Sequence, residues 1–132
     1  MVVYDLDGNL HKWSILGNTK NTRSNKSSLH KNACSLLSQV YPTLTILQEV
    51  PIPLRKNQVL FLDFYIPLLK KAIEVHGEQH YKFVAHYHSN AMGFMKHKKR
   101  DHDKQEWCES NGIEYIEHPY NEDVEQWTAR IK

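Results

Sequence analysis

Apolar side chains recur with a period of two in two segments between residues 60 and 75. Apolar residues occupy every second position from 60 to 66, and then positions 73 and 75. This spacing predicts two β-strands, each with one apolar face. The opposite face carries Asp63 on the first strand and Glu74 and His76 on the second. The segment therefore reads as a β-hairpin with one apolar and one polar face.

The turn of this hairpin determines which polar residues meet. If it is centred on residues 68 and 69, paired residues have numbers that sum to 137, and Asp63 faces Glu74. Carboxylates placed opposite each other destabilise a sheet, so the pair requires a cation. Oxygen ligands of this kind favour Mg²⁺ or Mn²⁺. The alternative is an ordinary hairpin whose carboxylates point into water, but the flanking apolar runs favour a covered, central strand.

Periodicity, caps and turn residues predict further elements on both sides of this hairpin. They are a small hairpin over 2–15, a helix over 29–40, a strand over 45–52, a helix over 91–110, a strand over 113–117 and a last helix capped by Asn121. The order is an α/β fold with an αβββαβ core and a mixed central sheet. We divide it into a hairpin and basic loop, 1–27, and a catalytic domain, 28–132. The helix over 91–110 has no apolar residue between Lys96 and Glu106, so its middle either crosses solvent or covers a polar site.

The composition, 40% apolar and 24% charged, is that of an ordinary globular protein. We expect a cytoplasmic protein with two reduced cysteines, because no apolar run could span a membrane and no signal peptide is visible. The net charge of +2 is unevenly distributed, with basic clusters near residues 12–31 and 96–100 and acids near the C-terminus. A polyanion such as DNA suits this distribution. Candidate contacts to the DNA backbone are Lys98, Lys99, Arg100, Lys104, Arg23 and Lys26, although both clusters can also be read as solvated surface.

The central hairpin resembles the PD-(D/E)xK nucleases. Asp63 is followed, after ten residues, by Glu74-Val75-His76, with histidine where that pattern usually has lysine. The pairs Asp63-Phe64 and His76-Gly77 are most similar to those of the very-short-patch-repair endonucleases and related homing endonucleases. A downstream Arg100-Asp101 within a basic run extends the likeness to roughly residues 28–118. The resemblance implies a restriction-endonuclease-like core that cleaves DNA with Mg²⁺ or Mn²⁺.

The resemblance also implies individual roles. Asp63 binds the metal, Glu74 is a second ligand at a position that is not acidic in the repair enzymes, and His76 lies beside the scissile phosphate. Three further site residues are implied: His30, where the family has a glutamate on the first helix; His80, one residue short of the family's second histidine; and Asp101, matching the downstream acid. The cysteines of the family's structural zinc site are missing, so none is expected.

Our first hypothesis is a metal-dependent endonuclease that nicks or cleaves duplex DNA, a homing or phage-type enzyme acting as a monomer or homodimer. A nuclease specific for branched or mismatched DNA is the nearest alternative. The missing lysine after Glu74 allows a second alternative, a catalytically inactive nuclease-fold protein that only binds DNA. A zinc site formed by His86, His88 and Cys108 is a further hypothesis.

Overall fold

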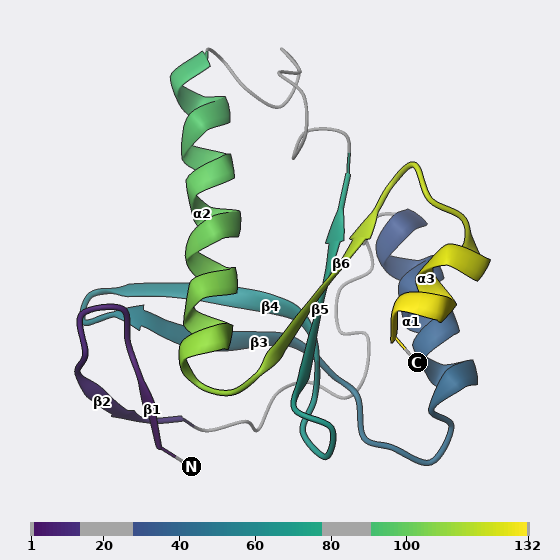
Figure 1. Cartoon of the computed structure of the whole chain (residues 1–132), viewed down its shortest axis with the longest axis horizontal. Helices are drawn as coiled ribbons and strands as arrows, with labels where there is room; N and C mark the ends of the chain where they lie inside the picture. The colour runs from purple at the N-terminus through teal and green to yellow at the C-terminus, as the bar shows by residue number, and fades with distance from the viewer. Residues whose placement is uncertain (1, 14–27, 78–90, 132) are drawn as a thin grey trace.

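The computed structural model describes residues 2–13, 28–77 and 91–131. Within these ranges the order of elements is the one that the sequence predicts (Figure 1): β1 (Val2–Tyr4), β2 (Leu10–Lys12), α1 (Ser28–Val40), β3 (Leu47–Arg55), β4 (Gln58–Ile66), β5 (Lys71–His76), α2 (Ala91–Ser110), β6 (Glu114–Pro119) and α3 (Val124–Ile131). The main sheet has the order β3-β4-β5-β6, antiparallel except for the parallel pair β5 and β6. The predicted α/β fold, an αβββαβ core with an N-terminal hairpin and a mixed sheet, is confirmed.

The register of the central hairpin is also the predicted one. Phe64 pairs with Ile73, Tyr65 with Ala72 and Ile66 with Lys71, and each pair of numbers sums to 137. The two strands lie in the middle of the sheet. Glu74 and Asp63 therefore occupy the next position beyond the last paired residues, as the sequence pattern requires.

Two element boundaries differ from the prediction. β3 continues through Pro51 and Pro53 to Arg55, because it is an edge strand of the sheet and a proline without an N–H is tolerated there. The last helix is capped by Asp123 rather than by Asn121. The Asp123 carboxylate accepts from the Gln126 N–H at 2.9 Å, and the Gln126 side chain accepts from the Asp123 N–H at 2.9 Å. This reciprocal pair is a capping box.

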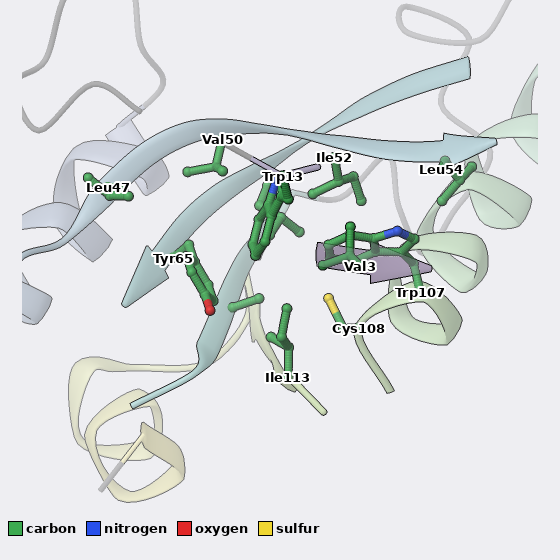
Figure 2. Close-up of a cluster of buried hydrophobic side chains, with 12 residues drawn as sticks. Val3, Trp13, Leu47, Val50, Ile52, Leu54, Tyr65, Trp107, Cys108 and Ile113 are labelled. Atoms are coloured by element: carbon green, nitrogen blue, oxygen red, sulfur yellow. The ribbon is translucent and has the colours of Figure 1, made fainter. Parts of the chain in front are cut away.

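Helices cover both faces of the sheet. Figure 1 shows α1 and α3 together on one side of β5 and β6, and α2 across β3 and β4. The α1 and α3 side chains pack with Phe64, Ile73 and Ile116 in one apolar cluster. Trp107 and Cys108, at the C-terminal end of α2, belong to the other cluster, drawn in Figure 2.

The N-terminal hairpin is part of this second cluster. Trp13 lies between Tyr65 and Trp107, with ring centroids 5.1 and 5.2 Å away, and its indole N–H donates to the Pro51 carbonyl at 2.8 Å. The Leu6 N–H donates to the Leu54 carbonyl at 2.8 Å. These contacts attach the hairpin to β3 and α2, although the loop between the two predicted domains lies outside the described residues.

Candidate active site

An acidic side chain of β5, Glu74, and a basic side chain of α2, Lys104, meet on the side of the sheet that α2 covers. β5 alternates so that Ala72, Glu74 and His76 face this helix, and Glu74 is 2% exposed. A carboxylate removed from water needs partners. The Lys104 ammonium of α2 lies 2.6 Å from Glu74 Oε1, and its side chain is 17% exposed. The polar middle of α2 therefore covers a polar site, which is one of the two arrangements its sequence predicts.

Asp63 and Glu74 are joined through each other's strands. The Asp63 N–H donates to Glu74 Oε2 at 2.6 Å, and the Val75 N–H donates to Asp63 Oδ2 at 2.9 Å. Beyond the last paired residues of β4 and β5, each carboxylate therefore accepts a hydrogen bond from a backbone N–H of the other strand. Within the described part of the chain, no donor reaches the second oxygen of Asp63.

The β3–β4 ribbon is irregular at the same place. Gln48 pairs with Phe64 and Val50 with Leu62, but the position between them, where Glu49 faces Asp63, is unpaired. Glu49 has a φ of 51°, a conformation that is uncommon for residues other than glycine. Irregular and strained strand positions occur preferentially beside functional sites. Glu49 is half-buried and lies opposite Asp63 in register.

His76 is held by residues of β6. Its Nδ1 lies 2.5 Å from Glu117 Oε1, and its Nε2 lies 3.3 Å from the Tyr115 hydroxyl and 3.9 Å from Asp101 Oδ1. A carboxylate only accepts, so Nδ1 carries the proton that is donated to Glu117. Nε2 is then the unprotonated nitrogen, which accepts from the Tyr115 hydroxyl.

Burial is the largest single influence on the pKa values of Glu74, Lys104 and Tyr115. It raises the pKa of Glu74 to about 8; the Asp63 charge adds to this rise and Lys104 opposes it. Burial, the largest single effect, would lower the pKa of Lys104, but the charge and hydrogen bond of Glu74 together with the charges of Asp63 and Asp101 outweigh it, and the net shift is upward. Burial and then the Glu74 charge raise the pKa of Tyr115, which keeps its hydroxyl protonated. Two carboxylates thus share one ammonium, and this part of the site would favour a further cation.

The donors present fit a magnesium ion in number and kind. Mg²⁺ prefers oxygen, retains several waters and often takes only one or two protein carboxylates. Asp63 and Glu74 supply these from adjacent strands, and Asp63 has an oxygen without a donor among the described residues. No group of three or more acidic, histidine or cysteine side chains in the described ranges is arranged to enclose a metal.

The other predicted site residues have varied surroundings. His30 of α1 bonds to the Gln48 side chain at 3.0 Å and stacks on Phe64 at 4.5 Å, so these contacts are with the α1 side of the sheet, whereas Glu74 faces α2. Asp101 lies near His76. Lys98, Lys99 and Arg100 are exposed on α2. A catalytic role for His30 stays a prediction.

Some predicted residues lie outside the described residues: His80, Arg23, Lys26, His86 and His88. Cys108, the third member of the hypothetical zinc site, is completely buried, and burial raises the pKa of its thiol to about 12.

Sequence reasoning missed three partners in this site. It assigned Lys104 to DNA contact, whereas its ammonium lies against Glu74, and it gave no role to Tyr115 or Glu117. The wholly polar middle of α2 was the one signal for the first. The parallel register of β5 and β6, which places Glu117 beside Glu74 and near His76, is set by a crossover that the sequence pattern does not specify.

Comparison with known proteins finds viral relatives. The chain is 43% identical over 64 residues to Uncharacterized protein 307L of Invertebrate iridescent virus 6, and 37% identical over 77 residues to Uncharacterized protein 094L of Frog virus 3. The matches cover 48% and 57% of this chain and 32% and 50% of those proteins, so the chain spans about a third of the first relative's length and half of the second's. No family model matches the chain, and the comparison with solved structures found no match. No helix among the described residues is long and apolar enough to cross a membrane.

Proposed function

We propose that this protein is a metal-dependent DNA endonuclease that nicks or cleaves duplex DNA by hydrolysing phosphodiester bonds. The observation that carries the proposal is the buried Glu74–Lys104 pair, joined to Asp63 and next to the oriented His76. A buried ion pair contributes little to stability compared with apolar packing. Perturbed titratable groups of this kind cluster at functional sites.

Lys104 supports the nuclease reading in a second way. The PD-(D/E)xK pattern usually places a lysine two residues after its second acid, and here that position is His76. The ammonium of Lys104 reaches the same acid from α2. The combination of acid, acid and lysine is therefore present in space although the sequence motif is interrupted.

Each residue then has a distinct task. Asp63 and Glu74 would hold Mg²⁺ or Mn²⁺, which when bound supplies a Lewis acid for the phosphate and lowers the pKa of a bound water. Lys104 neutralises part of the carboxylate charge. His76 Nε2 accepts or returns a proton near the scissile phosphate, a function typically worth about 10²–10⁴-fold in rate. Glu117 positions the imidazole and fixes its tautomer.

The relatives influence where the reaction would take place. They come from viruses named for invertebrate and frog hosts rather than from phages. We therefore propose an enzyme that acts on DNA in an infected animal cell instead of the phage-type nuclease that the sequence suggested.

A nuclease-fold protein that binds DNA without cleaving it is the second candidate. It is favoured by the engagement of both Glu74 oxygens, one by Lys104 and one by the Asp63 N–H. In this reading the ion pair is permanent and no metal enters.

Conversion of supercoiled plasmid to nicked or linear DNA tests the choice. Wild type should convert the plasmid with Mg²⁺ or Mn²⁺ and not with chelator, and Asp63→Asn should be slower by at least about 100-fold. Asp7→Asn, at an exposed position of the hairpin turn, is the matched control and should keep full activity. A four-way junction offered in parallel separates a structure-specific nuclease from a general one. No cleavage of either substrate by wild type would favour the DNA-binding candidate.

A further inference from the structure

A basic hollow lies between the β3–β4 turn and α2. Its volume is about 230 Å³, and its lining residues are Arg55, Gln58, Lys96, Lys99, Arg100 and Asp103. Positions 96, 99, 100 and 103 are spaced by three or four residues and so share one face of the helix. Asp101 and Lys104, which point to His76 and Glu74, lie on a neighbouring face. The hollow is therefore separate from the candidate active site although the same helix builds both.

The hollow has more positive charge than its own acid can balance. Asp103 is 6% exposed, and its carboxylate lies 3.5 Å from Arg55, which also donates to Gln58 at 2.8 Å. The one acid of the lining thus holds Arg55 in place. Within the described ranges no carboxylate pairs with Lys96, Lys99 or Arg100. Three cations consequently face the hollow without a counter-charge.

We infer that this hollow binds a backbone phosphate of a nucleic-acid duplex. An arginine fork and lysine ammonium groups match phosphate oxygens, and such contacts position a duplex without reading its sequence. The inference rests on the proposed function for the identity of the substrate. It also divides the basic run predicted from the sequence: Lys99 and Arg100 line the hollow, whereas the Lys98 ammonium lies over the Phe94 ring at 5.7 Å.

The hollow is placed to help the active site. Arg100 precedes Lys104 by one helical turn, about 6 Å along the helix axis. A DNA strand advances about 3.4 Å per nucleotide. A phosphate bound in the hollow would therefore belong to the same substrate, a few nucleotides from the one next to His76, and would fix the register of the strand over the site.

Salt-dependent binding of a labelled duplex, measured by fluorescence anisotropy in chelator, tests the inference. Lys99→Gln and Arg100→Gln should each reduce the slope of log K against log salt by about 0.9, which corresponds to about eightfold weaker binding at 0.1 M salt. Lys70→Gln is the matched control, since it removes the same charge from an exposed turn position outside the hollow, and it should leave the slope unchanged. All three positions are exposed, so the fold should be retained.

The outcomes separate this inference from the proposed function. Equal slopes for Lys99→Gln and Lys70→Gln would overturn the hollow as a phosphate site, even if wild type cleaves plasmid. Slopes that fall as expected, with no cleavage by wild type, would keep the phosphate site and reject the nuclease. Duplex DNA should show the slope change; a change seen with duplex RNA alone would contradict DNA as the source of the phosphate.

Discussion

The two faces of the four-stranded sheet have similar helical cover and very different contents. Under α1 and α3, Phe64, Ile73 and Ile116 pack in an apolar cluster. Under α2, the apolar cluster around Trp107 gives way along β5 to the buried Glu74 and His76. Because apolar burial stabilises a fold and buried charge seldom does, the apolar clusters of both faces stabilise the fold, whereas the buried polar residues under α2 are the ones to which we assign the proposed function.

The largest effect is expected from breaking the buried ion pair. Lys104→Met leaves the Glu74 carboxylate without its counter-charge and should lower the free energy of unfolding by about 3–5 kcal/mol above pH 8, where Glu74 is ionised. The loss should shrink as the pH falls, since a protonated Glu74 needs no cation. Urea unfolding of this variant measures both effects.

The double variant Glu74→Leu with Lys104→Met is the control for this prediction. Replacing both partners by apolar side chains should recover the lost stability while abolishing cleavage. If the double variant is as unstable as Lys104→Met, the two side chains must stabilise the fold through more than the attraction between their charges.

A buried histidine on the opposite face should affect stability and leave catalysis unchanged. His118 is fully buried, stacks on Trp127 at 4.7 Å and has neither ring nitrogen hydrogen-bonded within the described structure. Burial lowers the pKa of His118 to about 4, below its unfolded value of 6.5. The unfolded state therefore binds the proton first, and stability is lost as the pH falls from 6.5 towards 4.

His118→Phe isolates this contribution. The wild type should lose about 2 kcal/mol more than the variant between pH 7 and pH 5. Glu74 titrates in both proteins, so its opposite contribution cancels in the comparison. If the free energy of unfolding changes equally with pH in the wild type and in His118→Phe, His118 is not the group that causes the loss of stability at low pH.

A smaller effect is expected from the residue that positions His76. Glu117→Gln keeps the shape of the side chain and removes the charge next to Nδ1. Plasmid cleavage should slow by about 10–100-fold, while the affinity for duplex measured in chelator stays the same. Weaker duplex binding with an unaltered rate at saturation would identify Glu117 as a substrate contact instead.

The smallest effect is expected on the apolar face. Ile73→Val removes one buried methylene from the cluster under α1 and should cost about 1 kcal/mol in unfolding free energy. Cleavage per folded molecule should not change, although Ile73 is the neighbour of Glu74. A loss of activity at full folding would show that the two faces are not independent.

Local patterns predicted the fold well because they are set by neighbouring residues. Alternation and the turn around residues 68 and 69 gave the β4–β5 register, and with it the meeting of Asp63 and Glu74. The partners of the site could not be found in this way. Lys104 is 30 residues from Glu74, and Glu117 is 41 residues from His76, and both contacts depend on the packing of α2 and the parallel pairing of β6. The positive φ of Glu49 could not be predicted either, because position 49 is neither a glycine nor a proline.

Binding of Mn²⁺ to the free protein, followed by electron paramagnetic resonance, tests most directly whether the two carboxylates share a divalent ion. Wild type and Glu117→Gln should bind the ion, whereas Asp63→Asn should lose most of this binding while its unfolding curve stays close to that of wild type. Equal Mn²⁺ binding by wild type and Asp63→Asn, or none by wild type even with duplex DNA present, would contradict the account.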